Sequence, residues 1–154
     1  PPERTGRVAP EVADQLRARR GELADACGLL AESPVPSTWQ HGDLHQDNLR
    51  DTGDGIAFFD LGDGMWSHAV EVLCVPHGVV TDTGGIDWAD VARAWCEVWE
   101  VERPHFDELW RASGFTHAVN RAVTWHRALA TATTEEVLEW GNAVEHHLTS
   151  MLDA

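Results

Sequence analysis

The chain of 154 residues contains no lysine, and all 11 of its basic residues are arginine. A Walker-type phosphate loop needs its lysine, and kinases hold the nucleotide phosphates with a lysine on a strand. Residues 1–154 therefore cannot supply the lysine of a Walker-type loop or the strand lysine of a kinase. Arginine in place of lysine, with many alanines, is typical of a GC-rich bacterial genome.

Positive charge is also scarce: 26 acidic residues stand against the 11 basic ones, and the formal net charge is −15. A protein that binds nucleic acid through bulk charge is excluded, because it would need the opposite sign. Anionic membrane surfaces are disfavoured for the same reason. We expect neither nucleic acid nor a membrane as a partner, and such a surface suits a metal ion or a cationic small molecule better.

The sequence lacks any apolar run of the length that spans a bilayer, and no signal segment is visible at its N-terminus. Its three cysteines are widely spaced and form no CxxC pair, so we expect reduced thiols in the core of a cytoplasmic protein. The chain opens on Pro1-Pro2 without an initiator methionine. We therefore expect it to be a processed or truncated piece of a longer protein.

The periodicity predicts one helix from Pro10 to about Glu32, with apolar residues near helical spacing. Short strands are expected over residues 38–40, around residues 48–50 and over residues 56–59. Turn residues at 51–55 join the last two strands into a hairpin.

From Gly64 onward the pattern predicts helices almost to the end of the chain. Apolar faces recur over residues 87–101, 104–112 and 115–130, and most of the eight tryptophans fall within such faces, where core packing explains them. The residues Thr133-Thr134-Glu135-Glu136 form a capping box that opens a last helix. The expected fold is a single domain over residues 1–154, mainly α with a small β-hairpin.

The segment His41-Gly42-Asp43-Leu44-His45-Gln46-Asp47-Asn48-Leu49 concentrates polar side chains in one loop. Twelve residues after Asn48, an apolar strand ends in a second carboxylate, Asp60. This pattern fits phosphoryl transfer, in which one carboxylate orients the attacking hydroxyl and accepts its proton. Asp43 can take that role, while Asn48 and Asp60 can supply the oxygen ligands that Mg²⁺ prefers.

The segment 41–49 resembles the catalytic loop of the aminoglycoside phosphotransferase family, relatives of choline kinases and, more distantly, of protein kinases. The run Phe58-Phe59-Asp60-Leu61-Gly62-Asp63 resembles the metal-binding segment that follows in that family. The resemblance implies transfer of the γ-phosphate of ATP or GTP to a hydroxyl of a small molecule, such as an aminoglycoside-like or amino-alcohol acceptor. Mg²⁺ would be the metal.

Site roles follow from the resemblance, residue by residue. Asp43 matches the catalytic aspartate, and His41 matches the histidine that braces the loop. His45 occupies the place of a phosphate-contacting lysine, so it and Asn48 are the expected cofactor contacts. Asn48 and Asp60 match the metal ligands, and Asp63 is expected to assist them.

The helix before the loop, the hairpin and the helical remainder match the C-terminal lobe of this protein-kinase-like fold. Two departures accompany the match. The N-terminal nucleotide-binding lobe, with its glycine-rich loop and lysine, is absent from this chain. The stretch Gly-Asp-Pro-x-x-Asp-Leu that is frequent after the metal aspartate appears here as Trp66-Ser67-His68-Ala69-Val70-Glu71-Val72-Leu73. We expect this lobe alone to turn over slowly or not at all.

Other interpretations remain open at this point. A zinc site is possible with nine histidines, although His41 and His45 lie in a loop rather than on a helix. The acidic stretch between Asp82 and Glu108 is either a solvated helix face or a surface for a cationic acceptor. The alternative to an enzyme is a non-catalytic binding domain or a degenerate kinase-like protein. Apolar surface left by the missing lobe predicts a homodimer.

Overall fold

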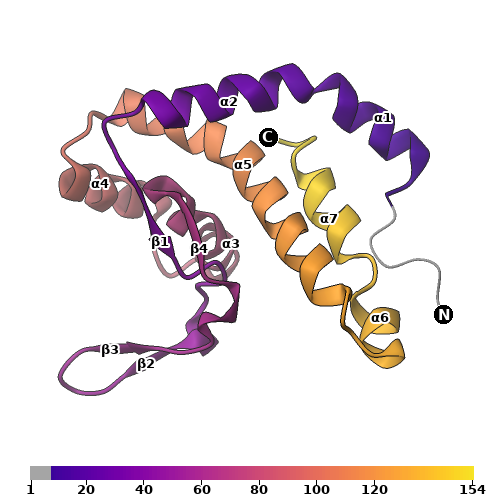
Figure 1. Cartoon of the computed structure of the whole chain (residues 1–154). Coiled ribbons are helices and arrows are strands. Elements are labelled where there is room, and N and C mark those ends of the chain that lie inside the picture. Colours follow the sequence, from indigo (N-terminus) through magenta and orange to yellow (C-terminus); the bar gives the residue numbers. More distant parts are fainter. Residues whose placement is uncertain (1–7) are drawn as a thin grey trace. The chain divides into compact units, whose positions relative to one another are not determined.

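The computed structural model describes residues 8–154 (Figure 1). Residues 1–7, which the expected single domain includes, lie outside the described part. The described residues group into two compact units, one of residues 8–29 with 114–154 and one of residues 30–113. Helices dominate, and the strands form two small antiparallel sheets of two strands each. The expectation of a mainly α protein with a small hairpin is thereby confirmed.

The first unit is helical. It contains α1 (Pro10–Ala18), most of α2 (Arg20–Glu32), the C-terminal part of α5 (Arg103–Leu129), α6 (Thr134–Trp140) and α7 (Ala143–Ser150). The single helix expected over residues 10–32 is divided at Arg19, whose guanidinium donates to the carbonyl oxygens of Met151 (2.6 Å) and Ala154 (3.0 Å). The expected last helix is likewise divided, between Trp140 and Ala143.

The core of the first unit forms between the C-terminal part of α5 and the two last helices. Ala122, Leu129 and Val144 are buried there, and partly buried apolar side chains such as Val137 and Leu148 pack against them. The rings of Trp125 and Trp140 stack with centroids 5.4 Å apart. The apolar periodicity of residues 115–130 therefore marks a real core face.

The second unit contains both sheets. Its elements are the end of α2, β1 (Ser37–Gln40), β2 (Leu49–Asp51), β3 (Ile56–Phe58), β4 (Met65–His68), α3 (Cys74–Thr83), α4 (Trp88–Trp99) and the N-terminal part of α5. Short 3₁₀ helices cover residues 46–48, 61–63 and 69–73. The hairpin β2–β3 confirms the expected turn at residues 51–55, and β1 lies in the other sheet, beside β4 (Figure 1).

Strand β4 was not expected, because residues after Gly64 were predicted to be helical. It pairs with β1 in antiparallel register, so that Trp39 lies opposite Trp66 and Gln40 opposite Met65. The sequence Met-Trp-Ser-His has no alternation of apolar and polar residues that would mark a strand. Only its pairing with the distant β1 makes it one.

The core of the second unit is built on α5, with α4 and the 3₁₀ helix at 69–73 contributing. Phe106 and Leu109 are fully buried, and the Trp95 ring lies 5.2 Å from that of Phe106. Two helices were expected between residues 104 and 130, but α5 is one continuous helix of 27 residues. Ser113, at the expected break, is buried and donates to the Trp110 carbonyl oxygen at 2.7 Å, so the helix continues through it.

The three cysteines are free, but they are not all core residues. Cys27 is exposed on α2, which corrects the expectation of three buried thiols. Cys74 lies with its sulfur 3.7 Å from the Ser113 hydroxyl, and burial raises the pKa of this thiol to about 12. Among the helices of the described residues, none combines the length and apolar character needed to cross a bilayer.

Candidate functional site

The loop that follows β1 is anchored by His41. This residue is buried, and its ring nitrogen Nε2 lies 2.7 Å from the carbonyl oxygen of Phe59. Its other nitrogen, Nδ1, accepts from the main-chain N–H of Asp43 at 3.4 Å. Because Nδ1 accepts, Nε2 is the nitrogen that carries the proton and donates. His41 thus ties the start of the loop to the residue that precedes Asp60.

Asn48 organises the other end of the loop from the 3₁₀ helix at 46–48. Its side chain is buried, and Nδ2 donates to the Asp43 carbonyl oxygen at 2.9 Å. The same nitrogen lies 3.1 Å from Nε2 of His45. With the amide nitrogen engaged in this way, the oxygen Oδ1 is the atom that Asn48 can offer to a ligand.

Asp60 is placed by the residue before it. The N–H of Phe59 donates to the Asn48 carbonyl oxygen at 2.9 Å, and the carbonyl oxygen of Phe59 receives His41. Both main-chain groups of Phe59 are therefore bound to the loop. Asp60 itself has the left-handed conformation, with φ 52°, which is uncommon outside glycine and costs roughly 1 kcal/mol. Its side chain is exposed at this strained turn.

A close backbone approach brings Asp63 to the same loop. Gly42 has φ 83°, and a Cβ atom at this position would fall far inside van der Waals contact of the Asp63 carbonyl oxygen. Only glycine combines this φ with this approach. The Asp63 backbone therefore packs directly on Gly42, between His41 and Asp43.

Two carboxylates flank His45. Its Nε2 lies 3.6 Å from Oδ2 of Asp43, and its Nδ1 lies 3.7 Å from Oδ2 of Asp47. About a third of each of the His45 and Asp43 side chains is exposed, whereas Asp47 is largely in solvent. The Asp43 carboxylate is thus accessible to a bound molecule and has an imidazole beside it.

Asn48 carries an amide oxygen, and Asp60 and Asp63 carry carboxylates. These are the kinds of oxygen that a hard cation such as Mg²⁺ prefers, and Mg²⁺ is usually bound through one or two carboxylates together with phosphate oxygens of a substrate. Within residues 8–154 no three His, Cys, Asp or Glu side chains are grouped so as to hold a metal by themselves.

The segment after Asp63 holds two buried polar residues that were not expected from the sequence. His68 and Glu71 are buried in the stretch that differs from the family pattern, and Nδ1 of His68 accepts from the Val70 N–H at 3.2 Å. Burial lowers the pKa of His68, and the nearby His105 lowers it further. Through β4 this segment supports β1, which leads into the loop. The departure from the family pattern at residues 66–73 was the only feature of the sequence that marked this segment.

The comparison with protein families gives one result. The model of the phosphotransferase enzyme family matches residues 2–105, which is well over half of the chain and includes His41, Asp43, Asn48, Asp60 and Asp63. No curated protein and no solved structure gave a significant match. The chain therefore belongs to the phosphotransferase enzyme family.

Proposed function

We propose that this chain is the C-terminal catalytic lobe of a small-molecule kinase, which transfers the γ-phosphate of ATP or GTP to a hydroxyl group. One observation carries the proposal: His41 and Asn48 both bind the main chain of Phe59. This arrangement joins the loop of Asp43 to the turn of Asp60. A base and a metal carboxylate held on one framework are what phosphoryl transfer requires.

Asp43 is the proposed base. Its carboxylate is partly exposed, so an acceptor hydroxyl can reach it. It orients the hydroxyl and accepts its proton while the hydroxyl oxygen bonds to the γ-phosphorus. The bond from that phosphorus to the bridging oxygen breaks, and the nucleoside diphosphate leaves. His41 is a positioning residue in this scheme, because its contacts are to the main chain of the loop and of Phe59.

Asn48, Asp60 and Asp63 would hold Mg²⁺ through their oxygen atoms. When bound, the ion neutralises charge on the phosphate groups. His45 is placed to contact a phosphate, because it lies between Asp43 and Asp47 and is partly exposed. Its imidazole can donate a hydrogen bond to a phosphate oxygen, but it does not replace a permanently charged lysine.

The absence of lysine from residues 1–154 determines what this lobe can do alone. We expect the cation that holds the nucleotide phosphates to come from an N-terminal lobe outside these residues. Until that cation is supplied, turnover should be slow or absent. Such a kinase would work in the cytoplasm, where nucleotides are abundant and free thiols persist.

A cationic acceptor is proposed because of the acidic residues on α4 and at the start of α5. Several of these are already engaged: Asp87 caps α4, and Arg93 pairs with Asp90 and Glu97. Arg103 pairs with Asp107 in the same way. Three further carboxylates of this stretch are exposed: Asp82, Glu100 and Glu102. These three are the candidates for attracting an amine.

Nucleotide binding provides the first test. We expect the purified chain to bind ATP or GTP only in the presence of Mg²⁺, as measured by calorimetry with and without a chelator. Asp60→Ala should weaken this binding by at least about tenfold, because it removes a metal ligand. Asp54→Ala is the matched control, since Asp54 is an exposed carboxylate in the turn of the same hairpin. It should leave the affinity unchanged.

Turnover is then measured with the N-terminal lobe supplied, against a panel of neutral and cationic alcohols. Asp43→Asn should lower kcat by about 10²–10⁴-fold with little change in nucleotide affinity. A preference for amine-bearing acceptors supports the cationic class. If Mg²⁺ does not promote nucleotide binding, and Asp60→Ala and Asp54→Ala behave alike, the non-catalytic binding domain replaces the enzyme.

A further inference from the structure

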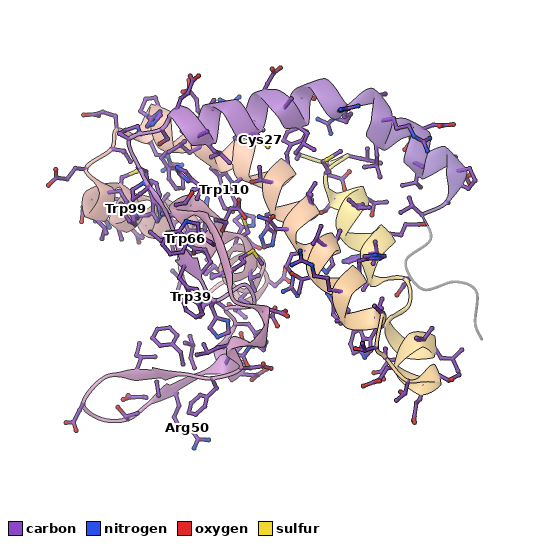
Figure 2. All side chains as sticks on the ribbon, viewed as in Figure 1. Cys27, Trp39, Arg50, Trp66, Trp99 and Trp110 are labelled. Carbon is purple, nitrogen blue, oxygen red and sulfur yellow. The ribbon has the colours of Figure 1, made fainter. Side chains whose placement is uncertain are left out.

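The ring of His45 lies between two side chains of its own loop, Asp47 and Asn48. Asn48 is buried at the end of the 3₁₀ helix at 46–48, His45 lies just before that helix, and Asp47 is largely in solvent. Arg50 follows on β2, but it is exposed, and Figure 2 shows its side chain extending away from the hairpin. The charged groups beside the His45 ring are thus the two aspartates that flank it.

The main chain fixes the direction of the Asn48 amide. Nδ2 of Asn48 lies 2.9 Å from the Asp43 carbonyl oxygen and 3.1 Å from Nε2 of His45. A carbonyl oxygen can only accept, so the atom that faces it is the amide nitrogen, which has two N–H groups to donate. One N–H meets the carbonyl oxygen and the other points to the His45 ring. The amide oxygen Oδ1 is therefore directed away from both partners.

The same contact decides which nitrogen of His45 carries the proton. A hydrogen on Nε2 would face an N–H of Asn48, and two donors cannot share one hydrogen bond, so Nε2 accepts and Nδ1 is protonated. Nδ1 lies 3.7 Å from Oδ2 of Asp47, which is too long for a hydrogen bond, but the negative charge there favours a proton on Nδ1. The Asp43 carboxylate, 3.6 Å from Nε2, favours the other tautomer. Because the two aspartates oppose each other, the Asn48 amide settles the choice.

We propose that His45 is a positioning residue, which holds the Asn48 amide with its oxygen toward the metal ion. The role rests on the proposed function, since it assumes that Asn48 binds Mg²⁺. A buried amide that loses an acceptor turns to find another, and its oxygen then leaves the direction of the metal. Asp47 supports this role by favouring the Nδ1–H tautomer. Nδ1–H can still donate to a phosphate oxygen, so the phosphate contact and the positioning role are compatible.

The tautomer is measured on the chain itself, without metal or nucleotide. Long-range ¹H–¹⁵N NMR spectra at about pH 8.5 show which nitrogen of each neutral histidine ring carries the proton. We expect Nδ1–H for His45 and Nε2–H for His41, whose Nδ1 accepts from the Asp43 N–H. Asn48→Ala should increase the Nε2–H fraction of His45, and Asp47→Ala should increase it by a smaller amount. A His45 ring that is mainly Nε2–H in the wild type overturns the inference.

Metal binding tests what the contact does. Mn²⁺, which also prefers oxygen ligands, replaces Mg²⁺, and electron paramagnetic resonance measures the unbound ion. His45→Phe keeps a ring but has no acceptor, and it should weaken Mn²⁺ binding by at least about tenfold. His45→Gln should keep most of the affinity, because its side-chain oxygen can accept from Asn48. Equal affinity in His45→Phe and the wild type, or an equal loss in both variants, overturns the inference.

Two further variants control the measurement. His126→Phe makes the same change at an exposed position of α5, and it should leave Mn²⁺ affinity unchanged. His45→Ala also lacks the acceptor, and it gives the same test if circular dichroism shows that His45→Phe is misfolded. A His45 that only contacts phosphate would lose nucleotide affinity in His45→Phe and keep Mn²⁺ affinity, which also overturns the inference.

The result separates this inference from the proposed function. If the wild-type chain binds no Mn²⁺, the metal site of the proposed kinase is overturned, and the role of His45 in that site is overturned with it. If the wild type binds Mn²⁺ and His45→Phe binds it equally well, the metal site stands and only the positioning role is overturned.

Discussion

Gly42 is the residue on which the geometry of the loop depends most directly. Its φ of 83° and its approach to the Asp63 carbonyl oxygen leave no room for a side chain. Gly42→Ala should therefore destabilise the second unit and displace the Asp63 segment from the loop. We expect a cost of about 1 kcal/mol for the left-handed conformation and about 1–3 kcal/mol more for the overlap.

Gly53 is the matched control for this substitution. It has the same conformation, with φ 84°, but a Cβ atom there meets nothing within 4 Å. Gly53→Ala should thus cost only the conformational term and leave Mg-nucleotide binding intact. Urea unfolding of both variants, with calorimetry of nucleotide binding, separates the two effects. If Gly42→Ala and Gly53→Ala lower the free energy of unfolding equally, the close approach of Gly42 to the Asp63 carbonyl oxygen is contradicted.

At the same scale, the sequence predicted candidate site residues but not how they are held. The spacing of Asp43, Asn48 and Asp60 predicted phosphoryl transfer, because the residue types themselves are what a metal and a base require. The role of Phe59 could not be read, since it acts through its main chain, which every residue possesses. Sequence alone likewise gave no sign that Asn48 binds the Asp43 carbonyl oxygen.

At the scale of elements, the turn and capping signals were read correctly, whereas features that depend on distant contacts were not. The hairpin β2–β3 is fixed by the turn chemistry within it, and helix α6 begins at the capping box. Strand β4 was missed because it depends on pairing with β1, more than twenty residues earlier. The break at Arg19 was missed because its contacts are to the carbonyl oxygens of Met151 and Ala154 at the far end of the chain.

The capping box of α6 gives an element-scale prediction. The Thr133 hydroxyl accepts from the Glu136 N–H, and the Glu136 carboxylate receives both the N–H and the hydroxyl of Thr133 at 2.7 Å. These bonds lower the pKa of Glu136. Thr133→Ala should destabilise the first unit by about 1 kcal/mol and raise that pKa.

Thr131 is the control for the cap. It is exposed in the same connection, and its hydroxyl makes only a long bond of 3.4 Å to the Ala128 carbonyl oxygen. Thr131→Ala should change the midpoint of urea unfolding little. If both variants unfold at the same midpoint, the capping box contributes nothing to stability.

At the scale of the whole molecule, the two units are built from different parts of the chain. The residues of the candidate site all lie in the second unit, whereas the first unit is formed by the two ends of the chain. Helix α5 belongs to both, so its 27 residues connect the core around Phe106 with the core around Leu129.

Stability should fall in mild acid because of His117 on α5. Burial lowers the pKa of this histidine to about 4, with further contributions from Arg121 and His147. The ordinary histidine pKa is about 6.5, so between about pH 6.5 and pH 4 the unfolded chain binds a proton that the folded chain does not. The free energy of unfolding is unaffected above this window. Within it, the free energy falls as pH is lowered, by about 3 kcal/mol in all.

Urea unfolding at about pH 7.5 and about pH 5 measures this loss, of which His117 should contribute about 2 kcal/mol. His117→Gln should reduce the loss by that amount, because glutamine takes up no proton. His126→Gln, at an exposed position of the same helix, should lose as much as the wild type. The buried His68 adds a loss of the same sign, since its pKa is also lowered. A fall in stability that His117→Gln leaves unchanged would place the acid sensitivity of the protein elsewhere.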